Sequence, residues 1–416
     1  MILSRYKKYI KSVSQYFSAS MIPMVLSLAI NPLLALNMSP EDYAIMGYYT
    51  SYTALFSPLV VFFMLHYYTK RYFEVTDDER EVLKAMIVKS LIYFSGILAV
   101  ICYVGLYIYH TCLNAQSSMQ FFPYAMLSVF ALPFSGIYNL MLCDMRMSRQ
   151  SGRYMRISIA AGIVLCGINL LLVVVFKWGA FGKLLSQFVV NVVFFIFGFI
   201  YFKDQIHLSF DFSQFKKMFQ FCLPLTIAAM LSFFTSGYDR VFLERLGNTV
   251  ELGYYSVGVT MAGYISVFQN AIGNTFQPDL FQAIVQKDRG RLFKVGLLIV
   301  GSTAAVVSIF IIAAPLVVKI LTAGRYMLSV KYTQIAALSI LTSAMYYMVS
   351  QITIALGKSQ VTLVTKILTS VCCIAMYSAS IRKFEFMGAA WGLVFSYLIS
   401  LVINLLVLWI SKLIKQ

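Results

Sequence analysis

Long apolar stretches alternate with short polar links along the whole chain. A transmembrane helix needs ~20 largely apolar residues to cross ~30 Å of hydrocarbon at ~1.5 Å per residue. Twelve stretches meet this requirement: 15–36, 44–66, 82–108, 119–142, 157–176, 179–202, 219–243, 252–276, 294–321, 330–355, 361–381 and 387–411. The pattern predicts an all-α integral membrane protein with two six-helix bundles, residues 1–204 and 205–416.

The composition supports a lipid environment and argues against a soluble or metal-binding protein. Hydrophobic residues make up 60% of the chain and charged residues 12%, whereas a soluble protein has roughly 25% charged residues. The seven cysteines form no CxxC motif and have no histidine at metal-ligand spacing. We therefore expect no disulfide framework, no metal site and no cofactor.

The net charge of +17 raises the question of nucleic acid as a partner. The basic residues, however, form short clusters at the ends of apolar stretches, which argues against a nucleic-acid surface. The N-terminal segment, the even-numbered links and the C-terminal tail hold 24 of the 33 Lys and Arg residues, including Lys358, Lys412 and Lys415. Because cytoplasmic ends are enriched in positive charge, both termini are predicted to be cytoplasmic.

Two short motifs recur between the halves. Residues 41–49 (EDYAIMGYY) are similar to residues 250–255 (VELGYY) at an offset near 209, and residues 177–182 (KWGAFG) to residues 383–388 (KFEFMG) at an offset of 206. With six spans in each half, both copies would enter the membrane in the same direction, as in a parallel repeat. Chance similarity between apolar-rich stretches is the alternative.

Four motifs together carry a family resemblance. They are Asn37–Ala44 (NMSPEDYA), Tyr238–Leu243 (YDRVFL) with the later Leu246-Gly247 and Gly253-Tyr254-Tyr255, Leu321–Tyr326 (LTAGRY) and Met387–Gly392 (MGAAWG). In their order and spacing, the chain resembles the polysaccharide flippase branch of the multidrug/oligosaccharidyl-lipid/polysaccharide exporter superfamily, which includes O-antigen and capsule-precursor flippases. It departs from the usual pattern at Ala44, where glycine is common, and at Val371-Cys372-Cys373, where an asparagine is common.

The resemblance implies a multidrug-and-toxin-extrusion-like fold and a transport function in a bacterial inner membrane. Its members move an undecaprenyl-pyrophosphate-linked oligosaccharide from the inner to the outer leaflet by alternating access. They work beside polysaccharide polymerase and chain-length proteins, and coupling to H⁺ or Na⁺ stays open. A polar cavity is needed because each unpaired hydroxyl or charge costs several kcal/mol in hydrocarbon.

Two cations inside predicted spans are candidates for binding the pyrophosphate. Arg240 offers a planar fork that donates to two oxygens at once, and Lys366 lies in the cytoplasmic third of the eleventh span. The alternative for Lys366 is snorkelling to the interface. For Arg240 it is a gating ion-pair network at the helix end with Asp239, Glu244 and Arg245, since Arg240 and Glu244 are one turn apart.

A stripe of amides on the eighth span is the candidate site for sugar hydroxyls. Asn270, Asn274 and Gln277 follow helical spacing, Ser266 extends the stripe and Gln269 flanks it. Amides both donate and accept hydrogen bonds, as sugar hydroxyls require; the alternative is hydrogen bonding between helices. Two further polar features are a weaker stripe on the tenth span, Ser343, Tyr347, Ser350 and Gln351, and Asn31 in the first span, also a candidate substrate contact.

Two other functions are weighed against the flippase. A cation-coupled multidrug or metabolite antiporter favours carboxylates deep in the first six spans, but there the acidic residues, Asp144 included, map at or outside span ends. A membrane-embedded glycosyltransferase or polymerase needs a catalytic domain of ~50 residues or more, whereas no predicted link exceeds about twenty residues. The sequence therefore favours a transporter over an enzyme.

Overall fold

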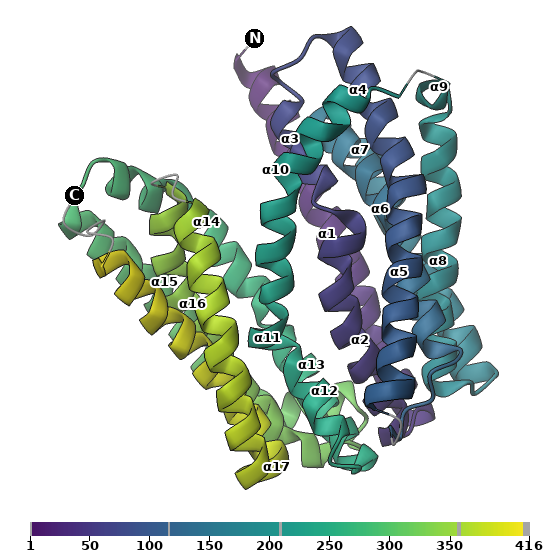
Figure 1. The fold of residues 1–416 in the computed structure, drawn as a ribbon, viewed down its shortest axis with the longest axis vertical. Helices are drawn as coiled ribbons and strands as arrows, with labels where there is room; N and C mark the ends of the chain where they lie inside the picture. The colour runs from purple at the N-terminus through teal and green to yellow at the C-terminus, as the bar shows by residue number, and fades with distance from the viewer. Residues whose placement is uncertain (1, 115–116, 208–209, 356–358, 411–416) are drawn as a thin grey trace. The chain divides into compact units, whose positions relative to one another are not determined.

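The computed structural model describes residues 2–114, 117–207, 210–355 and 359–410. Within these ranges the chain consists of helices joined by short turns and contains no strand (Figure 1). The basic residues Lys358, Lys412 and Lys415, and residue 411 at the end of the last predicted span, lie outside the described residues.

The helices divide into two compact units, and one helix contributes to both. Residues 1–39 and 52–227 form the first unit, and residues 40–51 and 228–416 the second. Helix α2 (Pro40–Val61) thus belongs to the second unit at its start and to the first unit over the rest of its length. The bundle boundary predicted at 204/205 stays a prediction.

The first unit is built of helices packed side by side. Its elements are α1 (Ile2–Asn37), the rest of α2, α3 (Met64–Arg71), α4 (Asp77–Lys89), η1 (Ser90–Phe94), α5 (Ser95–Ile108), η2 (Tyr109–Leu113), α6 (Tyr124–Met147), α7 (Ser151–Asn169), η3 (Leu170–Val175), α8 (Gly179–Tyr201), α9 (Lys203–Ile206) and most of α10 (Phe212–Leu231). Helix α6 packs against α5 and α8, and α1 packs against α7. Leu83, Met86, Leu140 and Met141 form part of its apolar core.

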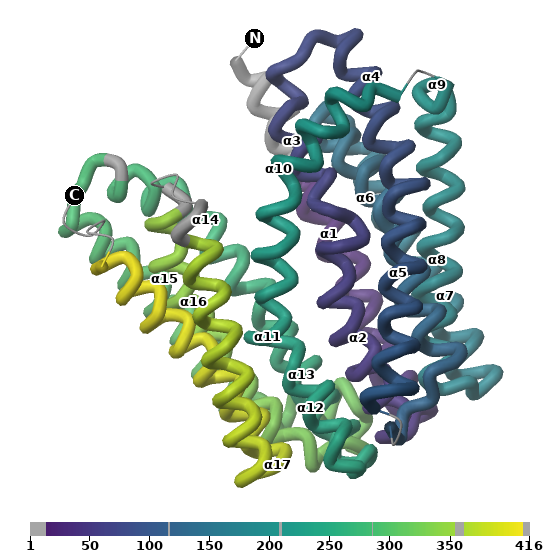
Figure 2. Tube along the Cα trace, in the orientation of Figure 1, coloured from purple at the N-terminus to yellow at the C-terminus, as the bar shows by residue number. Residues whose placement is uncertain are grey.

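The second unit is arranged around α16 (Figure 2). Its elements are the end of α10, α11 (Phe233–Ser236), α12 (Tyr238–Glu244), α13 (Thr249–Gly263), α14 (Ser266–Val285), α15 (Arg289–Leu321), η4 (Met327–Ser329), α16 (Val330–Ala355) and α17 (Ser359–Ile410). Helix α16 packs against α13, α14, α15 and α17. Leu280, Ile284, Val295 and Ile299 are buried together between α14 and α15.

The start of α2 packs against α13 through glycines. A Cβ atom on Gly253 would lie 2.0 Å from the carbonyl oxygen of Pro40, and one on Gly47 would lie 2.2 Å from Oγ of Ser256. Real Cβ atoms do not approach other atoms so closely, so the missing side chains permit this helix contact. Both contacts lie within the second unit.

The all-α membrane class is confirmed, but the count of twelve spans is not. Among the described residues nine helices are long and apolar enough to cross a membrane, or ten if α2 and α3, bent by 45°, count as one span. The predicted span 252–276 is two helices, α13 and α14, broken near Tyr264. The last two predicted spans lie within α17, where Glu385 has non-helical backbone angles and separates two helices.

The surface of α15 is typical of a helix that faces lipid. Ile309, Ile312, Leu316 and Ile320 follow helical spacing, and each side chain is more than half exposed. In water such a stripe would be costly, since burying apolar surface is favourable by roughly 25 cal/mol per Å². Its exposure is consistent with a hydrocarbon surrounding.

Candidate functional site

A cavity lined by three amide side chains and by apolar groups lies in the second unit, between α14, α15 and α16. The cavity is open to solvent, and its empty space amounts to about 290 Å³ when the open solvent at its mouth is counted. The lining residues are Gln269, Asn270, Gly273 and Asn274 from α14, Ile299 from α15, and Ala344 and Tyr347 from α16. No charged side chain lines it.

The two predicted polar stripes face each other across this cavity. Gln269 Nε2 donates to Ser343 Oγ at 2.8 Å, and two turns further along, Gln277 Nε2 donates to Gln351 Oε1 at 3.3 Å. Residues four apart share a helix face, so these contacts align the stripe of α14 with that of α16. Gln269 and Gln277 therefore make the interhelical hydrogen bonds that the sequence left as the alternative.

Asn270 and Asn274 differ from their glutamine neighbours. Both line the cavity, both side chains are exposed, and neither has a hydrogen-bond partner among the described residues. Ser266, at the start of the stripe, donates instead to the carbonyl oxygen of Gly263 at 2.6 Å. The free amides give the cavity donors and acceptors that are available to a ligand.

Asp239 and Arg240 lie on the short helix α12 and do not line this cavity. Asp239 is 1% exposed; its Oδ2 accepts a hydrogen bond from the Tyr255 hydroxyl, whereas its Oδ1 has no partner among the described residues. Arg240 Nε also has no hydrogen-bond partner there. The Cδ atom of Arg240 lies 3.4 Å from the position of a Cβ on Gly47, so its side chain reaches the start of α2.

The other predicted residues are placed apart from the cavity. Glu244 is 3% exposed and Arg245 is exposed, and neither lines the cavity. Lys366 Nζ lies 5.2 Å from the centroid of the Tyr346 ring, a cation–π contact. Asn31 is half-buried on α1 in the first unit.

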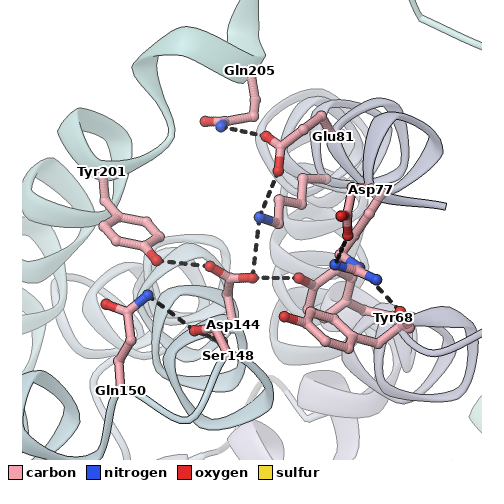
Figure 3. Close-up of polar contacts among 11 residues, drawn as sticks. Tyr68, Asp77, Glu81, Asp144, Ser148, Gln150, Tyr201 and Gln205 are labelled. Carbon is pink, nitrogen blue, oxygen red and sulfur yellow. Dashed lines mark hydrogen bonds and ion pairs between the residues drawn. The ribbon is translucent and has the colours of Figure 1, made fainter. Parts of the chain in front are cut away.

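A buried charge network in the first unit was missed by the sequence reasoning. Asp144 lies in the last turn of α6, at the end of the candidate span Tyr124–Met147 where the sequence predicted it, but its side chain is buried, with 3% exposed. It accepts hydrogen bonds from the hydroxyl groups of Tyr68 and Tyr201, the latter at 2.7 Å, and its Oδ1 lies 3.4 Å from Lys84 Nζ (Figure 3).

The network continues to a second carboxylate. Lys84 Nζ lies 2.9 Å from Glu81 Oε1, and Gln205 Nε2 donates to Glu81 Oε2 at 2.6 Å. The contacts join α3, α4, α6, α8 and α9. Tyr68 and Tyr201 stand 76 and 57 residues from Asp144 along the chain, so no local motif could have indicated the cluster.

Solved structures show which fold this architecture matches. An inward-facing multidrug resistance MATE family transporter of the MOP superfamily aligns with a TM-score of 0.69 and 14% identity, over 96% of this chain and 98% of that one. The lipid II flippase MurJ in an inward closed conformation aligns with a TM-score of 0.67 and 14% identity, over 97% and 87%. The fold is therefore that of MOP-superfamily transporters, as the sequence predicted.

Sequence comparisons agree with this fold. The chain is 24% identical, over 327 residues, to an uncharacterized membrane protein of Haemophilus influenzae, covering 76% of this chain and 75% of that protein. The family described as polysaccharide biosynthesis protein matches residues 9–284, more than half of the chain. The chain therefore belongs to the polysaccharide biosynthesis protein family.

Proposed function

We propose that this protein is a flippase that translocates an undecaprenyl-pyrophosphate-linked oligosaccharide from the inner to the outer leaflet of a bacterial inner membrane by alternating access. One observation carries the proposal: an uncharged cavity with free amides lies within a unit whose helices expose apolar side chains. Family membership links the chain to polysaccharide biosynthesis, and one solved protein of this fold is a lipid II flippase.

The energetic problem of such transport fits this architecture. A sugar hydroxyl without a partner costs several kcal/mol in hydrocarbon, and Asn270 and Asn274 offer replacement partners during the crossing. Arg240 and Lys366 are the proposed contacts for the pyrophosphate, because both are cations on half-buried positions within the second unit. Polysaccharide polymerase and chain-length proteins are the proposed partners after the crossing.

The proposal is tested by deleting the gene and locating the lipid-linked glycan. We expect the glycan to accumulate on the cytoplasmic side and to return outward on complementation. An unchanged distribution between the leaflets would contradict the flippase function.

The two cations are tested in the same complementation assay. We expect Arg240→Ala and Lys366→Ala to reduce surface glycan while the protein level in the membrane holds, because the pyrophosphate loses a charged partner. Lys217→Ala is the matched control, since Lys217 is exposed on α10. Surface glycan at the wild-type level in both variants would rule out their proposed role.

One observation favours a second candidate, a cation-coupled antiporter. Asp144 is a carboxylate buried within the first unit, and intramembrane carboxylates are typical of coupling sites. Its three polar contacts already compensate its charge, however, which weakens this candidate. The antiporter predicts a drug-sensitive deletion strain with normal surface glycan, in which Asp144→Asn fails to restore resistance.

A further inference from the structure

We propose that the cavity between α14, α15 and α16 is a subsite for one uncharged sugar ring of the transported glycan, which packs against the side chain of Tyr347. This inference rests on the proposed function and adds which part of the substrate enters the cavity. It also assigns a specificity role to Tyr347 and Gly273, both of which line the cavity.

The ring of Tyr347 lies beside Gly273, which has no side chain. A Cβ atom on Gly273 would lie 3.4 Å, 3.5 Å and 3.6 Å from Cε1, Cζ and Oη of Tyr347. Gly273 lies in the middle of α14 and its φ is ordinary for a helix, so the backbone conformation does not require glycine. A glycine inside a helix lowers helix stability, and here its effect is to keep the aromatic ring open to the cavity.

The groups that line the cavity match those of a sugar ring. A pyranose has hydroxyl groups at its rim and C–H groups on its faces. The face of an aromatic ring is electronegative and attracts weakly positive C–H groups, while the free amides of Asn270 and Asn274 donate to and accept from hydroxyls. Tyr347 and these two amides meet in one cavity, as such a ligand requires.

The lining of the cavity is uncharged. None of the seven lining residues is ionisable at neutral pH. A pyrophosphate or a uronate carboxylate in this cavity would lose its hydration without gaining an opposite charge, which is strongly unfavourable. Lys366 contacts Tyr346, whose side chain points roughly 100° away from that of Tyr347 around α16. The cavity therefore selects a neutral ring.

Hydrogen bonds between α14 and α16 hold the cavity in shape before any ligand enters. The hydrogen bonds from Gln269 to Ser343 and from Gln277 to Gln351 fix α14 against α16 on either side of Gly273. Ile299, 1% exposed, closes the side formed by α15. A preformed site loses less entropy when a ligand binds.

The test is saturation-transfer-difference NMR, which detects binding of a small probe to the full-length protein in detergent micelles. The probes are the methyl glycosides of glucose, galactose and N-acetylglucosamine, with glucuronate as the charged probe. We expect the ring protons of at least one neutral glycoside to receive saturation, and glucuronate to receive much less. Tyr347→Leu and Gly273→Ala should each lower the signal roughly fivefold, as expected for the loss of one aromatic contact.

Two matched variants separate the subsite from general effects on folding. Tyr347→Phe keeps the ring and should keep most of the signal. Gly301→Ala adds a methyl group on α15, where no atom lies within 4 Å, and should leave the signal unchanged. If Tyr347→Leu does not fold, the comparison of Gly273→Ala with Gly301→Ala decides the question.

The inference is overturned if no neutral glycoside receives saturation, if glucuronate binds as well as the neutral probes, or if Gly273→Ala binds like the wild type. Its failure is distinguishable from that of the proposed function. Glycan export that is lost on deletion, without glycoside binding, would leave the flippase standing and remove the subsite. If the protein binds a glycoside but its deletion leaves the glycan distribution between the leaflets unchanged, the subsite stands and the flippase function is contradicted.

Discussion

Two buried aspartates in this protein have very different surroundings. Asp144 accepts two phenolic hydrogen bonds and lies near an ammonium group, whereas Asp239 has one phenolic donor and an oxygen without a partner among the described residues. A buried carboxylate is costly unless it is paired and hydrogen-bonded. Asp144 is thus suited to holding helices together, while Asp239 keeps an unused acceptor.

Removing Asp144 should destabilise the first unit. Asp144→Ala removes the acceptor of the Tyr68 and Tyr201 hydroxyls and leaves Lys84 with Glu81 alone. Each buried donor left without a partner costs about 1–3 kcal/mol. We expect a large fall in the thermal unfolding midpoint in detergent. Glu74→Ala is the control, because its ion pair with Arg71 is exposed and such pairs contribute about 1 kcal/mol or less. Equal midpoints for both variants would refute this role of Asp144.

For single residues, the sequence predicts which side chains share one face of a helix. It does not predict which side chains on distant helices meet. The stripes of α14 and α16 follow from helical spacing, and the structure brings them together through Gln269 and Ser343. The cluster around Asp144 depends on how α3, α6 and α8 pack. No spacing rule relates residues on separate helices, so that cluster required the fold.

At the scale of helices, the sequence predicts the kind of element correctly. It does not predict every break between helices. Hydropathy stays high across Tyr264, so an apolar pattern alone does not reveal that the helix is interrupted there. At Glu385, by contrast, the charged residues between the last two predicted spans indicate the break that the structure has. One break has a counterpart in the other unit. Gly179 (φ 49°) and Glu385 (φ 48°), the third residues of the two similar motifs, both have positive φ. The repeat between the halves stays a prediction, and this shared local conformation is consistent with it.

Adding one methyl group between α2 and α13 should separate these helices. In Gly253→Ala the new Cβ would meet the backbone oxygen of Pro40, which cannot rotate away. Overpacking of this kind costs typically about 1–3 kcal/mol, so we expect a lower unfolding midpoint and less protein in the membrane. Gly301→Ala, with open space around it, should be neutral or stabilising by up to about 1 kcal/mol. A Gly253→Ala protein as stable as wild type would exclude the tight contact.

For the whole molecule, the membrane class followed from composition, whereas orientation rests on charge alone. Basic residues gather at alternate ends of the apolar stretches, which predicts cytoplasmic termini. The structure supplies an exposed cysteine, Cys112, at the end of η2, with which the orientation can be measured.

Labelling in intact cells should place Cys112 outside the cytoplasm. We expect a variant that retains Cys112 as its sole cysteine to react with a membrane-impermeant maleimide, because the link after the third predicted span has no basic residue. Asp78→Cys in a variant without other cysteines should react only after permeabilisation, since Asp78 is exposed next to a basic cluster. The reverse pattern would invert the predicted orientation.

The division of α2 between the two units has a consequence for how the protein is made. Residues 40–51 leave the ribosome early, yet the surface they cover on α13 is synthesised only after the entire first unit. The second unit is therefore completed by an early segment and a late one, and the nascent chain must keep the early segment accessible. Of the fragments 1–227 and 228–416 produced separately, the first would contain its whole unit, whereas the second would lack residues 40–51, which the first fragment carries.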